Sequence, residues 1–491
     1  MRLPGIAVVG AVTVGLGCAT LPPCPARGGP AWSEYSSEHF ELQTTMEAPI
    51  AKGVVRMLEE TRAAMLGMVW GDQPGPPERT RAILLESGEH LKAVAGDGVA
   101  GFYVRRSPLP PTMVFAADTV GNIESIKHEL AHDLSFWFLP FQPGWYSEGI
   151  ATYLETIEYD RAQGRATVGE VSKWRLEMVR QQGVMNLERL MGPVPTEGLE
   201  HRAFECSNWL FVHYLLNHHE QAFRRFQTRL GAMEPSQQAW RAEFSKVDPA
   251  KLEYGLRKYS HIATYVVASR AIAPWLGEVR DRPMSDAEVH GSRAFLYSVF
   301  HPIGEKPQLD KARVELDEAM SAPVPPIDAL ALAFYSRLAK DVTARVALAQ
   351  RAAATHADNW LSWIMVADST DPKSPEHESA LDRALDLAPD EREVLVRAAI
   401  SKARQERWDE AVVFSTRALR GRAVRTDLWE VHLTALAKTG FCAEAEQWAT
   451  TLVGALPPRT SQPIAALWAT LKPGCVPRPP RAKPSPAPPP N

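Results

Sequence analysis

The chain has 491 residues, of which 45% are hydrophobic and 23% charged, an ordinary globular composition with length for two or three domains. Lys and Arg total 54 against 58 for Asp and Glu, so no basic excess exists and nucleic acid is not expected as a partner. Five cysteines are too few for a disulfide framework and lack zinc-finger spacing. After the N-terminus, no apolar run reaches the ~18 residues that a membrane span needs.

The first 18 residues have the features of an export signal. Arg2 precedes an apolar run of eleven residues, 6–16, which is too short for a bilayer and suits a signal-peptide core. The run ends in Gly15-Leu16-Gly17-Cys18 and resembles a bacterial lipobox, although Gly15 stands where Leu is usual. The resemblance implies that Cys18 is diacylated and anchors the mature protein by lipid in the cell envelope, with the outer membrane expected. Secretion to the periplasm after a later cleavage is the alternative.

The residues after the signal and the remaining cysteines fit this location. Residues 19–31 are rich in Pro and Gly, which is typical of a short tether. In an oxidising compartment Cys442 and Cys475 are able to pair, whereas Cys24 and Cys206 have no evident partner.

A mixed strand and helix pattern follows the tether. Strands are predicted at 39–45, 81–86 and 113–116, and helices at 49–70 and 122–139, from apolar periodicity and Pro positions. The chain is expected to be almost entirely helical from there to about residue 470, with 236–310 as a helical linker region. Residues 471–491 are Pro-rich without an apolar face, which predicts a disordered tail.

The C-terminal third contains a sequence period. Ala384-Leu385, Ala418-Leu419 and Leu452-Val453 are 34 residues apart. This period, with small residues at most helix crossings, resembles tetratricopeptide repeats and implies such helices over 311–470. The resemblance implies a surface for a protein partner; a helical scaffold without a ligand is the alternative. Because repeats contact mainly their neighbours, this region is expected to fold without the preceding domain.

A metal-binding pentapeptide lies inside the helix predicted at 122–139. His128-Glu129-Leu130-Ala131-His132 is an HExxH sequence. On a helix the two imidazoles at i and i+4 share one face and can bind one Zn²⁺ ion, while Glu129 can take a proton from the attacking water. Since the pentapeptide also occurs by chance, a pair of surface histidines is the alternative.

The segment that follows supplies a third metal ligand. Residues 143–155 contain Trp145-Tyr146-Ser147-Glu148-Gly149-Ile150-Ala151, which resembles the Trp-x-x-Glu-Gly-x-Ala helix of gluzincin peptidases. The resemblance implies that Glu148 is the third zinc ligand. Glu155 lies two helical turns later and is a candidate acceptor for the free N–H of a ligand histidine, or a solvated carboxylate.

A wider resemblance to bacterial peptidase MA-like proteins covers 32–235. It rests on the segments 32–42, 98–103 and 204–216, although Phe204 stands where many relatives have Tyr. It implies an α+β zincin-like N-terminal domain, followed here by an all-α domain of tetratricopeptide-like helical repeats. It also implies a zinc metallopeptidase, with endopeptidase activity on a peptide or protein substrate.

Two questions stay open at this point. The group that would stabilise the oxyanion is not identified; the candidates are Tyr146, Tyr153, His201, His213 and Tyr214, each of which is more often a packing or surface residue. The second question is whether the domain is catalytically idle and serves as a repeat-based protein-binding module. Intact ligands and an intact Glu129 favour the enzyme.

Overall fold

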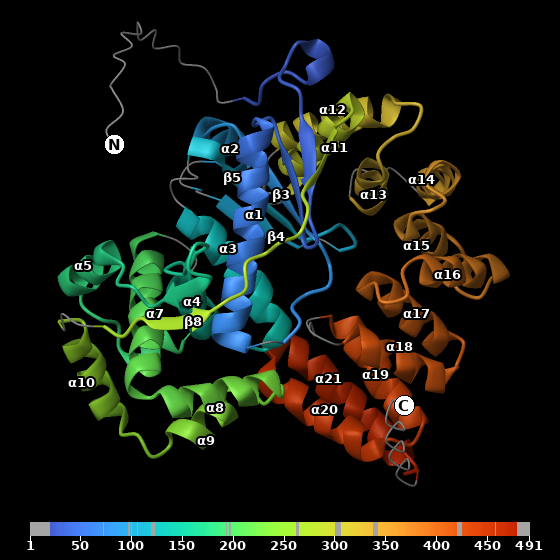
Figure 1. The fold of residues 1–491 in the computed structure, drawn as a ribbon. Helices are drawn as coiled ribbons and strands as arrows, with labels where there is room; N and C mark the ends of the chain where they lie inside the picture. Colours follow the sequence, from blue (N-terminus) through green and yellow to red (C-terminus); the bar gives the residue numbers. More distant parts are fainter. Residues whose placement is uncertain are drawn as a thin grey trace, which may run out of the picture.

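The computed structural model describes residues 20–478, except for 72, 97–98, 100, 106, 119–122, 193, 196–197, 262–264, 300–305, 337–341, 420–424 and 457. The segment predicted to be an export signal, with Cys18, and the last part of the tail, from residue 479, lie outside the described residues. The fold is mixed α/β, with an N-terminal sheet region followed by a large helical region (Figure 1). None of the helices in the described part of the chain combines the length and apolarity needed to cross a bilayer.

A six-stranded sheet with the order β4-β5-β3-β2-β1-β9 lies at the centre of the N-terminal region. The strands are β1 (Ser33–Ser36), β2 (Phe40–Thr44), β3 (Thr80–Leu85), β4 (Gly101–Val104), β5 (Thr112–Ala116) and β9 (Arg280–Pro283). β2, β3 and β5 are mutually parallel, and the other three strands are antiparallel to their neighbours. The three strands predicted from the sequence are thus confirmed, and they are the parallel ones.

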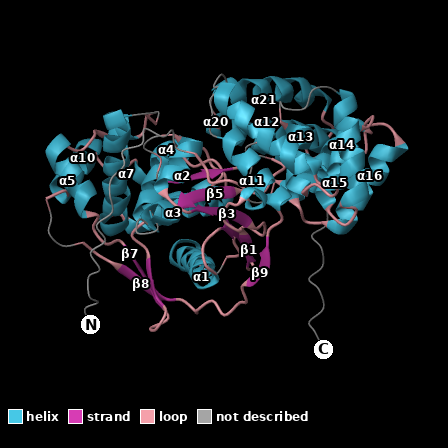
Figure 2. Ribbon diagram, turned by 90° about the horizontal axis from the view of Figure 1, so that it is seen from above, coloured by secondary structure: helices cyan, strands magenta, loops and turns pink. Residues whose placement is uncertain are grey.

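Both faces of the sheet are covered, which explains why β3 is buried along its whole length. Leu84 packs in one hydrophobic core with helices α1 (Ala48–Met65) and α3 (Ile123–Phe138). Its neighbour Ile83 points to the opposite face and packs in a second core with α11 (Asp286–Val299) and α12 (Lys306–Ser321). Figure 2 shows α1 on one side of the strands and α12 on the other. The first helices of the helical region, α11 and α12, therefore cover the second face of the sheet.

The segment expected to be a tether is part of this second core. Leu21 and Cys24 are buried in it, and the backbone N–H of Ala26 donates to Asp286 Oδ1 at 2.9 Å. Residues 21–27 are thus packed against the folded protein, and the prediction of a tether is wrong for them.

The prediction that residues 139–470 are almost entirely helical is wrong, because this part of the chain also contains four strands. A second sheet of order β6-β7-β8 combines β6 (Glu158–Asp160), β7 (Arg165–Val168) and β8 (Ala268–Ala271). β8 and β9 lie within 236–310, which is therefore not a purely helical linker. All residues of these two strands are exposed, so they pair through their backbones and their sequence carries no apolar alternation to predict them.

The C-terminal helices stack as successive pairs along one arc (Figure 1). They include α16 (Pro375–Leu387), α17 (Arg392–Arg404), α18 (Trp408–Ala418), α19 (Thr426–Lys438), α20 (Cys442–Ala455) and α21 (Pro458–Leu471). The starts of α18 and α20 keep the 34-residue period found in the sequence. Ala418 and Ala445 are buried where the helices meet, so small side chains allow close helix packing.

The end of the chain is more ordered than the sequence predicts. Cys475 forms a disulfide with Cys442, which confirms that pairing. The N–H of Arg478 donates to the carbonyl of Gly440 at 2.9 Å. The tail predicted to be disordered is therefore packed on α19 and α20 up to residue 478.

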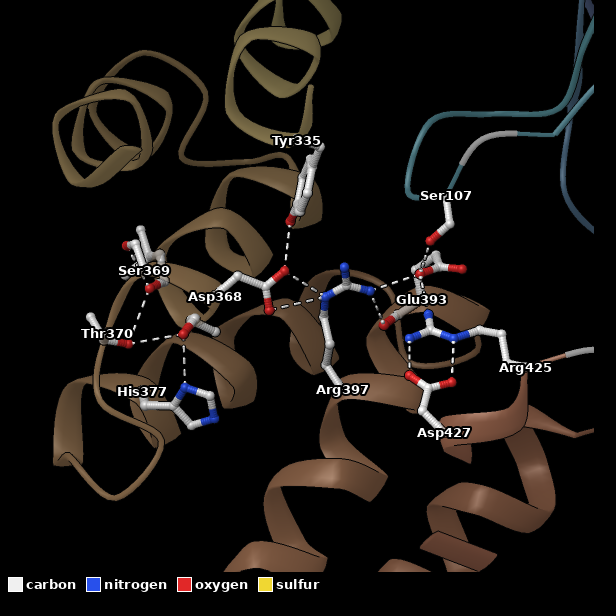
Figure 3. Close-up of polar contacts among 12 residues, drawn as sticks. Ser107, Tyr335, Asp368, Ser369, Thr370, His377, Glu393, Arg397, Arg425 and Asp427 are labelled. Atoms are coloured by element: carbon white, nitrogen blue, oxygen red, sulfur yellow. Dashed lines mark hydrogen bonds and ion pairs between the residues drawn. The ribbon is translucent and has the colours of Figure 1, made fainter. Parts of the chain in front are cut away.

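The helical arc contacts the sheet region beyond α12. Figure 3 shows Ser107, from the loop before β5, directed at Glu393 on α17, with an Oγ–Oε2 distance of 2.6 Å. Glu393 also pairs with Arg397 at 2.7 Å and with Arg425 at 3.2 Å. Phe141, from the turn after α3, is buried in the core formed by α17 to α21. These contacts and the shared second core argue against the expectation that 311–470 folds on its own, which a fragment of these residues would test.

Candidate metal centre

Helix α3 separates its apolar residues from its metal-binding residues. Ile126, Leu130 and Leu134 are buried in the first core. Because these positions are four residues apart, they form one stripe along the helix. His128 and His132 lie on the opposite side and are partly exposed. The apolar pattern of α3 therefore orients both imidazoles away from this core.

Helix α4 (Gly144–Leu154) supplies Glu148 and packs between α3 and α7 (Gly198–His218). A Cβ atom on Gly149 would lie 2.5 Å from Val212 Cγ2 and 2.9 Å from the carbonyl oxygen of Asn208, both on α7. Glycine at this position thus permits the close approach of α4 to α7. The approach places Glu148 opposite the two histidines.

Three donor atoms converge between α3 and α4. Nε2 of His128 lies 3.0 Å from Nε2 of His132. Oε2 of Glu148 lies 3.6 Å from Nε2 of His128 and 3.8 Å from Nε2 of His132. The donor set of two imidazole nitrogens and one carboxylate oxygen is one that Zn²⁺ uses in catalytic sites, with a position left for water. The three residues predicted as ligands are thus brought together.

The far side of each imidazole has a partner that fixes the ring. Nδ1 of His128 lies 2.8 Å from Oε1 of Glu155, and the other carboxylate oxygen pairs with Arg175 at 2.5 Å. Nδ1 of His132 lies 3.2 Å from the hydroxyl of Ser147. When Nδ1–H of His128 donates to Glu155, the lone pair of Nε2 faces Glu148 and His132, which is the tautomer that a metal requires. The arrangement therefore fits a divalent cation.

Charge is distributed unevenly in this centre. Burial disfavours a charged His128, but the neighbouring carboxylates of Glu148 and Glu155 outweigh it and raise its pKa to about 10. Burial and the neighbouring charge of His128 lower the pKa of His132 to about 4. Burial also raises the pKa of Glu129 to about 7, although the charge on His128 opposes that shift.

Glu129 borders a cavity next to the three donors. The cavity has a volume of about 480 Å³, and its lining includes Gly101 of β4, His128, Glu129, Trp174 and Glu205. Glu129 is next in sequence to His128, but it is not one of the residues whose donor atoms converge. A carboxylate in this position can exchange a proton with a reactant held in the cavity.

Four of the five oxyanion candidates make contacts that involve no residue of the metal centre. Tyr146 is fully buried and accepts a hydrogen bond from Gln227. His213 lies within 2.9 Å of Tyr259 Oη and of the Gly169 carbonyl. Tyr153 packs against His213, and Tyr214 packs against the ring of Tyr259.

His201 is the candidate that lies beside the centre. Its Nε2 is 3.3 Å from Oε1 of Glu205, a residue of the cavity lining. The pKa of Glu148 is lowered mainly by His128 and His132, which outweigh its burial, and His201 adds the smallest contribution.

Several residues of the centre were not predicted from the sequence. Arg175, Trp174 and Glu205 come from α5 (Lys173–Gln182) and α7, and Ser147 precedes Glu148. The i, i+4 spacing of His201 and Glu205 was a usable signal. No comparable signal in the sequence indicated Arg175, because Arg175 lies on α5 and its partner Glu155 lies at the end of α4. A scan against protein-family models and a search of curated proteins find no match for this chain.

Proposed function

We propose that the protein is a zinc-dependent peptidase of gluzincin type, in which His128, His132 and Glu148 hold the metal and Glu129 is the general base. The sheet region then corresponds to a zincin-like domain, and the helical arc to tetratricopeptide-like repeats. The observation that carries the proposal is the convergence of three donor atoms from two helices, with Glu155 and Ser147 behind the imidazoles. Surface histidines on an ordinary helix would not have these partners.

The side chains then have separate roles. Zinc, when bound, polarises a carbonyl group and lowers the pKa of a coordinated water. Glu129 accepts the proton of the attacking water and delivers it to the departing amine, so the proton count balances. Burial favours this role, since it raises the pKa of Glu129 toward neutrality. Glu155 is a positioning residue that acts through His128, and Arg175 fixes Glu155.

An extended peptide fits the edge of the sheet beside the centre. β4 is an edge strand whose sheet neighbour is β5, and its Gly101 lines the same cavity as His128 and Glu129. A peptide can add to such an edge through backbone hydrogen bonds, independently of its side chains. This geometry favours cleavage within a chain and supports endopeptidase activity.

The proposal includes attachment to the envelope membrane through Cys18, which rests on the lipobox alone. Labelling of the protein with a fatty-acid analogue should be lost in Cys18→Ser. Equal labelling of the two proteins would reject the anchor and leave secretion to the periplasm. The helical arc is proposed to bind a protein partner or the substrate.

The deciding experiment compares wild type with Glu129→Gln, which keeps the shape of the side chain but removes the base. Wild type loaded with zinc should cleave an unfolded protein substrate, and Glu129→Gln should bind zinc equally while its rate falls by ~10²–10⁴. Equal rates in the two proteins would reject this mechanism. Zinc binding without cleavage by wild type would favour the idle, partner-binding alternative.

A further inference from the structure

A second group of metal-binding side chains lies on the other face of the sheet. Sγ of Cys24 is 3.4 Å from Nδ1 of His290 and 4.0 Å from Oε2 of Glu315. Nδ1 of His290 is 2.5 Å from Oε2 of Glu315. Cys24 comes from the N-terminal segment, His290 from α11 and Glu315 from α12, and all three residues are buried.

The group is surrounded by the supporting contacts that metal ligands have. Nε2 of His290, on the far side of the ring, lies 3.3 Å from Oδ2 of Asp286. The second oxygen of Glu315 is held by the guanidinium of Arg293 at 2.7 and 2.8 Å. In protein metal sites, ligand histidines are oriented by a carboxylate behind the ring. Ligand carboxylates are oriented by a hydrogen-bond donor on the oxygen that does not bind the metal. His128 and Glu155 form the same imidazole–carboxylate pair in the first centre.

From this geometry we propose that Cys24, His290 and Glu315 form a second binding site for Zn²⁺. Their donor atoms lie within 4.8 Å of one another, as do those of the first centre. A thiolate, an imidazole and a carboxylate form a donor set that suits zinc and does not suit Mg²⁺ or Ca²⁺, which take oxygen ligands. Binding displaces the thiol proton of Cys24 to solvent as the sulfur–zinc bond forms.

The proposed role of this site is structural, because its ligands join the N-terminal segment 21–27 to helices α11 and α12. Residues 21–27 are also held by Arg27, which pairs with Glu318, and by Arg293, which donates to the Pro22 carbonyl. A metal bound to Cys24 on this segment and to His290 and Glu315 on the two helices would tie all three elements together. The second site does not depend on the peptidase activity of the first.

Cobalt spectroscopy of the purified protein separates the two sites. Co²⁺ bound at Cys24 should give a thiolate-to-cobalt charge-transfer band in the near ultraviolet, whereas the ligands of the first centre contain no sulfur. The band should persist in the double variant His128→Ala/His132→Ala and in Cys206→Ala, which removes the other free cysteine among the residues that the structure describes. It should be absent in Cys24→Ala, and bound zinc should fall from about two ions per chain to about one.

His290→Asn gives a second test if Cys24→Ala fails to fold, since it keeps the thiol and removes the imidazole. This variant should bind Co²⁺ at Cys24 at least tenfold more weakly. A band that survives in Cys24→Ala would overturn the proposal. Wild type that binds a single zinc ion and shows no band would overturn it as well, and would leave the first centre intact.

Discussion

Glu155 links the metal centre to the surrounding fold, and its replacement by Gln tests that link. The carboxylate lies between Nδ1 of His128 and the guanidinium of Arg175. The side chains of Glu155 and Arg175 are only 5% and 8% exposed. Glu155→Gln keeps an oxygen that can accept from His128 but removes the negative charge that both neighbours use.

Two effects of this substitution can be estimated separately. Loss of a partner behind a ligand histidine typically weakens metal binding by ~10–100-fold, which corresponds to about 1.4–2.7 kcal/mol. Arg175 also loses its partner in a buried ion pair, and breaking such a pair typically costs ~3–5 kcal/mol of folding stability. The double variant Glu155→Gln/Arg175→Met removes the charge of Arg175 as well, so it should recover stability but not zinc affinity.

Zinc affinity is measured by competition with a chelator, and stability by denaturant unfolding of the same samples. Glu220→Gln is the matched control, because Glu220 and its partner Arg224 are both exposed, at 55% and 58%. It should leave both quantities unchanged. Zinc affinity of Glu155→Gln equal to that of wild type would refute the positioning role of Glu155. Recovery of zinc affinity in the double variant would show that only folding had been affected.

A fragment of residues 311–470 should melt without cooperativity by circular dichroism, since α12 loses the sheet that completes its core; a sharp transition would contradict the shared core. Cys475→Ser should lower the denaturant midpoint, because the disulfide with Cys442 typically contributes ~2–4 kcal/mol; an unchanged midpoint would show that it does not stabilise the fold. Burial lowers the pKa of His432 from 6.5 to about 4. The unfolded chain therefore binds more protons between these values, so stability is complete above pH 6.5 and falls by about 3 kcal/mol as the pH drops toward 4. His432→Phe should remove that part of the pH dependence, and an identical pH profile in this variant would reject the assignment.

The sequence predicted the elements whose signal is local. The parallel strands were recognisable because β2 alternates apolar and polar residues while β3 and β5 are short apolar runs, and α3 was recognisable because its apolar stripe recurs every turn. His128 and His132 followed from their spacing on one helix. Glu148 required the resemblance to gluzincins, since no rule of local structure relates it to residues on the preceding helix.

What the sequence could not predict depends on contacts between distant segments. β9 carries no apolar pattern, because it joins the sheet through its backbone beside β1. Arg175 meets Glu155 only after α5 packs against α7. Cys24 had no evident partner, since its neighbours His290 and Glu315 are 266 and 291 residues away. Composition also suggested a tether at 19–31, although part of that segment is buried.

Anomalous diffraction at the zinc absorption edge, from crystals of Glu129→Gln grown with zinc, tests the assignment of the metal centre most directly. This variant keeps the three ligands and cannot turn over substrate by the proposed route. The expected result is an anomalous peak within bonding distance of Nε2 of His128, Nε2 of His132 and a carboxylate oxygen of Glu148. Zinc-saturated crystals with no peak between these three residues would contradict it.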